Sequence, residues 1–172
     1  MDRDQLRALQ APLKAAYKDE PGQALITLKA DGTLGEGISC SVNTGKALAE
    51  AGLHPATGGD GTLLCSGDML LEALAACAGV TLKAVATSIG IGVENGRVHA
   101  EGDLDFRGTL GVDKAAPVGF EEIRLSFELE TDADDEQLAT LLKLTERYCV
   151  VYQTLARGPR LQVAMDRVAA AA

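Results

Sequence analysis

Apolar and polar residues alternate along the segment GFEEIRLSFELETD, residues 119–132. Successive side chains of a strand point to opposite faces of a sheet, so this alternation predicts a strand with one buried face and one wet face. The segment GRVHAEGDLDFRGTL, residues 96–110, also has the composition of a strand. We expect the polar stretch between them, GVDKAAPVG, to form a long turn.

Turn-forming residues suggest how the preceding part of the chain is organised. The segment QALITLKADGTLGEGISCSVNTG carries strand-forming residues on both sides of an Asp-Gly pair. Asp-Gly favours a tight turn, so we expect a hairpin in which residues 24–29 pair with residues 36–42. Residues 47–65 are rich in Gly and small side chains, which is typical of a loop. A short final strand is expected at residues 161–165.

The segment SGDMLLEALAACAGVTLKAVATSIGIG predicts a long helix. Ser66 is a candidate N-cap, and Gly90 or Gly92 a candidate C-terminal stop. Only Glu72 and Lys83 are charged between residues 69 and 89, and apolar residues occur all round the helix. We therefore expect a central helix that is buried on most sides. The alternative, a membrane span, is disfavoured because charged and hydroxyl side chains interrupt the apolar run.

Two further helical regions are indicated by apolar residues at three- to four-residue spacing. The segment DADDEQLATLLKLTERYCVVYQTL shows this spacing and begins with acidic residues, which stabilise the positive end of the helix dipole. Residues 2–18 predict one or two amphipathic turns that are interrupted at Pro12. The elements together indicate an α+β fold. We expect a single domain over residues 1–172, with an N-terminal helical arm at 1–20 and a core at 21–166.

Composition and charge narrow the classes of function. The net charge of −9 repels phosphate backbones and anionic lipid, so neither nucleic acid nor a membrane surface is an expected partner. The N-terminal segment is charged from its second residue and lacks the apolar run of a signal peptide, which favours a cytoplasmic location. Four cysteines in that compartment are expected to be free thiols. Because none shows CxxC spacing, no metal site is expected, and no motif indicates a cofactor.

Cys77 and Cys149 are the candidates for chemistry. A cysteine is a nucleophile only as its thiolate, which requires a nearby cation, a helix N-terminus or a hydrogen-bond donor. Cys77 lies about two and a half turns into its predicted helix, so its activation must come from elsewhere in the fold. Each cysteine alone also fits the role of a small apolar side chain in a crowded core, and the spacing leaves both interpretations open.

Four segments of the sequence resemble those of a known protein family. DMLLEALAACAGVTLKAVA, EGDLDFRGTLG, GFEEIRLSFELETDAD and TERYCVVYQTL occur in the order and approximate spacing of the OsmC/Ohr family of thiol-dependent peroxidases, which the chain resembles over roughly residues 24–166. The resemblance implies an intertwined homodimer, in which antiparallel curved sheets wrap two central helices and the active sites lie at the subunit interface.

The same resemblance implies a mechanism. Cys77 matches the family's peroxidatic cysteine and Cys149 its resolving cysteine. The implied activity is reduction of an organic hydroperoxide through a Cys77–Cys149 disulfide, in defence against oxidative stress, with an external dithiol such as a lipoyl or thioredoxin-like protein as reductant.

The chain departs from the family pattern at two supporting positions. The family pairs its peroxidatic cysteine with an Arg from the first hairpin, where Lys29 is the nearest cation here. Asp68 is the best match for the family's carboxylate, although nine residues of continuous helix would place it opposite Cys77. Asp68 can therefore act only if the chain before Met69 is not helical.

The missing Arg keeps an alternative function open. On the same fold, the protein could bind or sense an apolar ligand or a reactive sulfur species without being a peroxidase. Cys65 is interpreted as a bystander, the role of Cys40 is left open, and His54 beside Pro55 is interpreted as a surface residue rather than the lining of a site.

Overall fold

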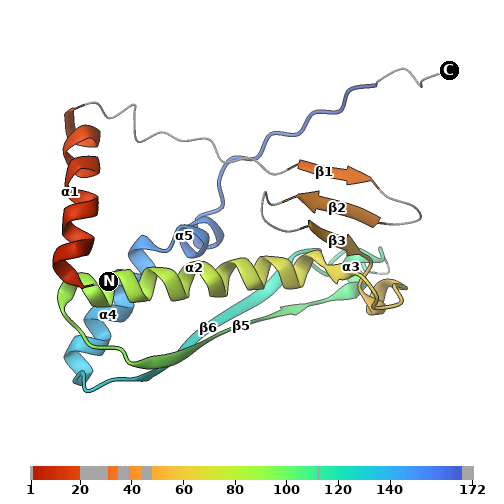
Figure 1. The fold of residues 1–172 in the computed structure, drawn as a ribbon. Helices are drawn as coiled ribbons and strands as arrows, with labels where there is room; N and C mark the ends of the chain where they lie inside the picture. Colours follow the sequence, from red (N-terminus) through yellow and green to blue (C-terminus); the bar gives the residue numbers. More distant parts are fainter. Residues whose placement is uncertain (1, 20–30, 35–38, 44–47, 112, 168–172) are drawn as a thin grey trace.

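A computed structural model describes residues 2–19, 31–34, 39–43, 48–111 and 113–167. The fold is α+β, and one long helix runs through its middle (Figure 1). In chain order the elements are α1 (Arg3–Asp19), β1 (Asp31–Leu34), β2 (Ser39–Asn43), β3 (Leu48–Gly52), η2 (Pro55–Thr57), β4 (Leu64–Cys65), α2 (Ser66–Ile89), β5 (Asn95–Leu104), α3 (Phe106–Thr109), β6 (Phe120–Glu130), α4 (Asp135–Tyr148) and α5 (Val150–Ala156).

The strands β5 and β6 form an antiparallel ribbon along one side of α2 (Figure 1). Their register places Val98 opposite Phe127 and Ala100 opposite Leu125. These side chains pack against the buried face of α2. Arg124 belongs to the other face of the ribbon and forms ion pairs there with Glu101, Asp103 and Glu122. Apolar and polar residues of β6 therefore alternate for the predicted reason, because one face of the strand is packed and the other is solvated.

The helix α2 starts and stops close to the predicted positions. Cys65 rather than Ser66 is the N-cap, and the Cys65 side chain makes no capping hydrogen bond. Gly90 ends the helix in the left-handed conformation, at a φ of 79°, as a C-terminal glycine commonly does.

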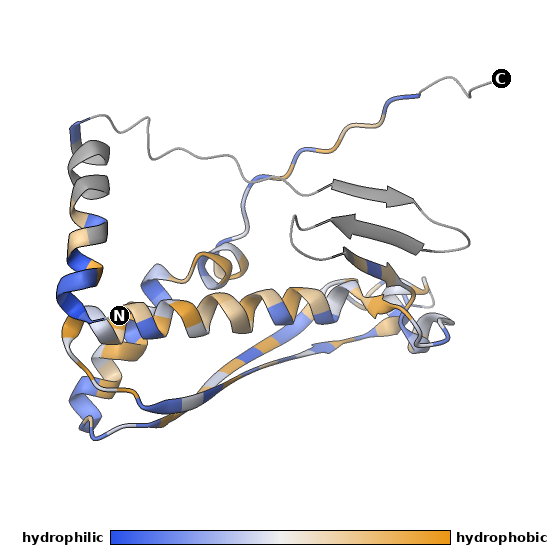
Figure 2. Ribbon diagram, viewed as in Figure 1, coloured by the Kyte–Doolittle hydropathy of each residue, from blue (hydrophilic) through white to orange (hydrophobic). Residues whose placement is uncertain are grey.

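The predicted burial of α2 on most sides is wrong for a single chain. A single stripe of its residues is buried, against β5, β6, α4 and α5: Leu74, Ala78, Leu82, Val85 and Ala86. The opposite side lacks a covering element among the described residues, and Val80 is 73% exposed there. In Figure 2 the helix nevertheless has apolar colours along most of its length. By length and composition α2 could cross a membrane, but the core helix of a soluble protein passes the same test.

The first sheet contains β1 to β4 and corrects two predictions. Asp31 and Gly32 lie in β1, where Asp31 is opposite Asn43, so the chain reverses after Leu34 rather than at the Asp-Gly pair. Residues 24–29 of the predicted hairpin lie outside the described residues. The predicted loop at 47–65 instead contains β3, η2 and β4, because β3 pairs with both β2 and β4. Local composition does not reveal such pairing between distant segments.

Three other segments differ from the predictions. Residues 106–109 form the short helix α3 rather than strand, because the Asp105 side chain accepts a hydrogen bond from the Arg107 backbone and caps a helical turn. The helix α1 continues through Pro12, since a proline removes one backbone donor without necessarily ending a helix. The predicted final strand is not formed within the chain, and its apolar side chains at 161, 163 and 165 are 81–96% exposed.

Candidate functional site

The fold brings Cys77 and Cys149 together, although more than seventy residues separate them in the sequence. Cys77 lies on α2, and Cys149 lies between α4 and α5. The two residues belong to the same apolar cluster, with Leu74 and Ala78 of α2. Cys149 is 1% exposed, whereas Cys77 is half-buried. A molecule arriving from solvent therefore meets the Cys77 side of the pair.

The position of Cys149 is set by the junction of two helices. The residue has extended backbone angles, and it is both the C-cap of α4 and the N-cap of α5. Its N–H donates to the carbonyl of Thr145, and its carbonyl accepts from the N–H of Gln153, both at 2.9 Å. These two bonds tie Cys149 to the helices on either side, so its side chain is held against α2.

Hydrogen bonds lower the pKa of Cys77. Burial raises the pKa of this thiol, because desolvation disfavours the charged form. Donors outweigh that effect: the backbone N–H groups of Val151 and Val150, the thiol of Cys149 and the hydroxyl of Thr81. The net pKa lies below the ordinary cysteine value. The activation that the sequence left unassigned thus comes from the backbone at the start of α5 and from two uncharged side chains.

The pKa of Cys149 moves in the opposite direction. Burial raises it most, and the neighbouring Cys77 sulfur raises it further. Backbone donors from Tyr152 and Val151 only partly offset this rise. The opposite shifts favour ionisation of Cys77 before Cys149, and the Cys149 thiol donates its hydrogen bond to the Cys77 sulfur. The two cysteines are thus differentiated into the more acidic thiol, Cys77, and a hydrogen-bond donor, Cys149.

We expect Cys77 to react with iodoacetamide at lower pH than a free cysteine does. Only the thiolate reacts, so the rate should rise with pH to a plateau whose midpoint is the lowered pKa. Peptide mass spectrometry after short pulses gives the rate for Cys77 alone, and the same peptide in urea-unfolded protein is the control. Equal midpoints in folded and unfolded protein would favour the binding or sensing alternative.

The supporting residues do not gather at Cys77 as the family pattern implies. Because α2 is continuous from Ser66, Asp68 lies about 14 Å along the helix from Cys77 and half a turn round it. The condition for Asp68 to act on Cys77 in the same chain, a non-helical segment before Met69, is not met. Lys29 lies outside the described residues.

Asp68 lines a different cavity, of about 330 Å³, together with His54 and Cys65. His54 is half-buried, in contrast to the surface position expected from the sequence. Its ring stacks on Phe106 at 4.9 Å, and its Nδ1 accepts the backbone N–H of Ala56 at 3.0 Å. The imidazole thus stabilises the turn at η2. In the described part of the chain, no three His, Cys, Asp or Glu side chains lie close enough to hold a metal ion.

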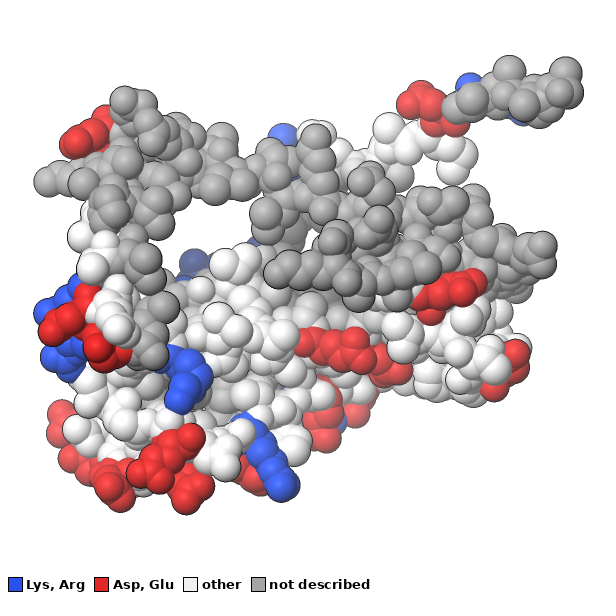
Figure 3. Space-filling view, in the orientation of Figure 1, with Lys and Arg blue, Asp and Glu red and all other residues white. Residues whose placement is uncertain are grey.

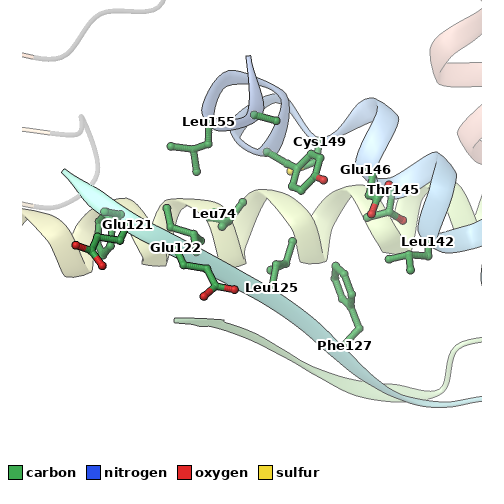
Figure 4. A pocket seen from close by; sticks show the side chains of 14 residues that line it. Leu74, Glu121, Glu122, Leu125, Phe127, Leu142, Thr145, Glu146, Cys149 and Leu155 are labelled. Atoms are coloured by element: carbon green, nitrogen blue, oxygen red, sulfur yellow. The ribbon is translucent and has the colours of Figure 1, made fainter. Parts of the chain in front are cut away.

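A larger cavity, of about 480 Å³, borders Cys149 between β6, α4 and α5 (Figure 4). Its walls are mainly apolar side chains, three glutamates also line it, and Cys77 is not among the lining residues. Thr145 also lines it, is 1% exposed, and has no hydrogen-bond partner for its hydroxyl among the described residues. The lining residues are Leu74, Phe120, Glu121, Glu122, Ile123, Leu125, Phe127, Leu142, Thr145, Glu146, Cys149, Tyr152, Leu155 and Ala156.

Sequence reasoning identified the two sulfurs and missed most of the groups around them. Thr81 stands one turn after Cys77, and helical spacing places the two residues on one face, but the sequence did not indicate that the Thr81 hydroxyl donates to the Cys77 sulfur. Val150 and Val151 act through backbone N–H groups, which a residue type does not reveal. Nothing in the sequence indicated that Thr145 lines a cavity, because threonine is common on either face of an amphipathic helix.

Comparison with known proteins gives consistent results. The sequence profile of the family described as OsmC-like protein matches residues 59–164, more than half of the chain. No curated protein sequence matches this chain.

Several solved structures share the fold. An OsmC-like protein from Mycoplasma pneumoniae has a TM-score of 0.64 at 19% identity, covering 77% of this chain and 89% of its own. An organic hydroperoxide resistance protein OsmC from Legionella pneumophila has a TM-score of 0.61 at 20% identity, covering 78% and 91%. An organic hydroperoxide resistance protein from Elizabethkingia anophelis has a TM-score of 0.60 at 20% identity, covering 78% and 90%.

Proposed function

The chain belongs to the OsmC-like protein family, and on that premise we propose that it is a cysteine-based peroxidase for organic hydroperoxides. The observation that carries the proposal is the contact between two cysteines whose pKa values are shifted in opposite directions. A lowered pKa increases the fraction of Cys77 present as the nucleophilic thiolate, and an adjacent thiol supplies the group that can resolve its oxidised form. Two cysteines that served only core packing would not need this differentiation.

The proposed cycle balances atoms and electrons in three steps. The Cys77 thiolate attacks the distal oxygen of the hydroperoxide, the S–O bond forms as the O–O bond breaks, and the alkoxide takes a proton from water and leaves as the alcohol. The resulting Cys77 sulfenic acid condenses with the Cys149 thiol, releasing water and forming a disulfide. An external dithiol then reduces that disulfide to two thiols by exchange. A reducing, cytoplasmic compartment would supply such a dithiol.

A product count tests the proposal. Reduced protein mixed with excess cumene hydroperoxide and no reductant should release close to one cumyl alcohol per subunit and then stop. Adding dithiothreitol should restart alcohol formation, because it regenerates both thiols. Protein carboxymethylated at its thiols is the control and should release none. Failure of the untreated protein to exceed this control would remove the peroxidase proposal.

We also propose that the protein acts as a homodimer. The uncovered side of α2 is apolar and built mainly of small residues, including Ala73, Ala76 and Val80. Val150 of α5, 69% exposed, follows directly after Cys149. Figure 3 shows an uncharged surface over the middle of α2, between acidic and basic groups. Contiguous apolar surface of this kind indicates a protein interface, and small side chains allow a second α2 to approach closely beside Cys77.

Substituting Val80 with Glu should convert the dimer to a monomer. Burying an unpaired carboxylate in each half of a symmetric interface costs about 3–5 kcal/mol, or at least about a hundredfold in the dissociation constant. Analytical ultracentrifugation at micromolar concentration measures the change. Val118→Glu is the matched control, because Val118 is similarly exposed, at 65%, in the turn before β6. Identical masses for wild type and V80E would contradict this interface.

A further inference from the structure

The cavity of about 480 Å³ lies on the side of α2 that faces β6, α4 and α5 (Figure 4). Leu74, which belongs to the buried stripe of α2, forms part of its wall. The cavity therefore lies away from the uncovered side of α2, and the dimer proposed above does not cover it. Its volume is within the range of small-molecule sites.

The cavity is separate from the approach to Cys77. Cys77 is not among its lining residues, and Cys149, which does line it, is only 1% exposed. The Cys149 thiol already donates its hydrogen bond to Cys77, so it is not free to bind a molecule in the cavity. A molecule bound here would lie behind the pair of cysteines and would meet no reactive sulfur.

A buried hydroxyl without a partner indicates what kind of molecule fits. Thr145 of α4 lines the cavity, is 1% exposed, and has no hydrogen-bond partner for its hydroxyl within the described residues. The large majority of buried polar side-chain atoms do have a partner, because leaving one unpaired is costly. Most of the surrounding wall is aliphatic or aromatic, including Leu125 and Phe127. An apolar molecule that brings one hydrogen-bond acceptor to Thr145 would match both the wall and the hydroxyl.

The acidic residues of the cavity select against anions. Glu122 is paired with Arg124 at 3.2 Å, whereas Glu121 and Glu146 form no ion pair within the described residues. All three glutamates are exposed, so their charge faces whatever approaches from solvent. The net charge of −9 acts in the same direction. A neutral molecule is therefore favoured over a carboxylate of the same shape.

We propose that this cavity binds a neutral, apolar molecule with one hydrogen-bond acceptor, such as a ketone or an amide, which accepts from the Thr145 hydroxyl. The site is independent of the peroxidase function proposed above, since Cys77 does not line it and no step of that reaction passes through it. A ligand in this position contacts β6, α4 and α5 together, because all three contribute to the wall.

Binding of Prodan, a neutral naphthalene dye with a single ketone, tests the proposal. We expect wild-type protein to bind one Prodan per subunit, with the emission shifted to shorter wavelength by the apolar wall. Thr145→Val should weaken binding about tenfold, because the ketone loses its donor. Dye bound to T145V should also emit at still shorter wavelength, since a hydrogen bond to the ketone shifts the emission the other way. Equal affinity and equal emission in the two proteins would overturn the proposal.

The melting temperature of T145V separates ligand binding from a purely structural role of Thr145. Because the hydroxyl is unpaired in the free protein, its removal should leave the melting temperature unchanged or raise it. A lower melting temperature would show that the hydroxyl is already paired within the protein, which would remove the basis of the proposal.

Two variants and one modification locate the bound dye. Ala156→Phe, which fills part of the cavity, should block Prodan, whereas Ala115→Phe in the exposed turn before β6 should not. Protein alkylated with iodoacetamide at Cys77 should bind Prodan as the untreated protein does. Binding that survives in A156F, or that is lost on alkylation, would place the dye elsewhere and overturn the assignment.

An anionic dye tests the selectivity. Replacing Glu121 and Glu146 together with Gln should strengthen binding of anilinonaphthalene sulfonate several-fold at low ionic strength and leave binding of Prodan unchanged. Equal affinity of the sulfonate for this variant and for the wild type would overturn the selectivity for neutral molecules.

The C-terminal segment is the competing occupant of the cavity. Its apolar side chains Leu161, Val163 and Met165 are 81–96% exposed, and the segment follows α5 directly. We expect a chain that ends at Ala156 to bind Prodan as the wild type does. Binding that appears only after this truncation would assign the cavity to the C-terminal segment, of the same or another copy, and would overturn the small-molecule site.

Discussion

Replacing Cys77 with Ser should abolish hydroperoxide reduction, with a loss of about a thousandfold or more. Serine keeps nearly the same shape but has no accessible anion at neutral pH, so the backbone donors of Val150 and Val151 have no nucleophile to stabilise. Loss of cumene hydroperoxide in the presence of dithiothreitol measures the effect. Circular dichroism of the variant checks that the fold is retained.

Cys65→Ser is the matched control for this substitution. Cys65 is also a half-buried free thiol, but it lies at the start of α2 and lines the cavity with His54 and Asp68. We expect C65S to retain the activity of the wild type. If C77S and wild type consume peroxide equally slowly, the chain is not a peroxidase. A loss in C65S equal to that in C77S would place the nucleophile elsewhere.

Replacing Cys149 should separate oxidation from turnover. Without a resolving thiol, Cys77 should still release one alcohol as it forms its sulfenic acid, and each further oxygen that the sulfenic acid takes from a hydroperoxide should release one more. Steady-state turnover with a dithiol should fall by about a hundredfold, because the over-oxidised sulfur is not reduced by thiols. Intact-mass measurements during the reaction show the added oxygen atoms.

Two replacements at Cys149 divide its roles. Cys149→Ser keeps a hydroxyl that can donate to the Cys77 sulfur, whereas Cys149→Ala removes the donor. We therefore expect the iodoacetamide midpoint of Cys77 to stay near that of the wild type in C149S and to rise in C149A. Full turnover in both variants would show that Cys149 does not resolve the sulfenic acid.

The sequence predicted the elements whose patterns are local. Alternation identified β6, and helical spacing with acidic residues at the start identified α4, whose N-cap Asp134 and Gln137 form a reciprocal pair of bonds with the backbone. The helix α2 was identified by its apolar length and its terminal Gly90. These signals come from residues that are close together in the sequence. They can therefore be recognised without knowing which distant segments pack against each other.

Elements that depend on distant partners were not predictable in this way. The strand β3 exists because it pairs on both sides, and α1 continues through a residue that usually ends helices. The burial of α2 was overestimated because an apolar pattern does not distinguish side chains buried within one chain from side chains that another copy of the chain would bury. The proposed dimer would account for that difference.

The candidate site was also predictable only in part from the sequence. The segments that resemble the family identified Cys77 and Cys149 as candidates, and the fold brings the two residues into contact. The activating groups were sought among charged side chains, whereas the donors to Cys77 are backbone N–H groups, a thiol and a hydroxyl. Asp68 matched by position in the sequence but lies on the opposite side of a continuous helix.

Disulfide mapping tests the central claim most directly. Reduced wild-type protein is treated with one equivalent of cumene hydroperoxide, alkylated, digested without reductant and analysed by mass spectrometry. The account predicts loss of two hydrogens per subunit and a single cross-linked pair of peptides that contain Cys77 and Cys149, with Cys40 and Cys65 alkylated. Recovery of Cys149 as a free thiol beside an oxidised Cys77, or of all four cysteines unchanged, would contradict it.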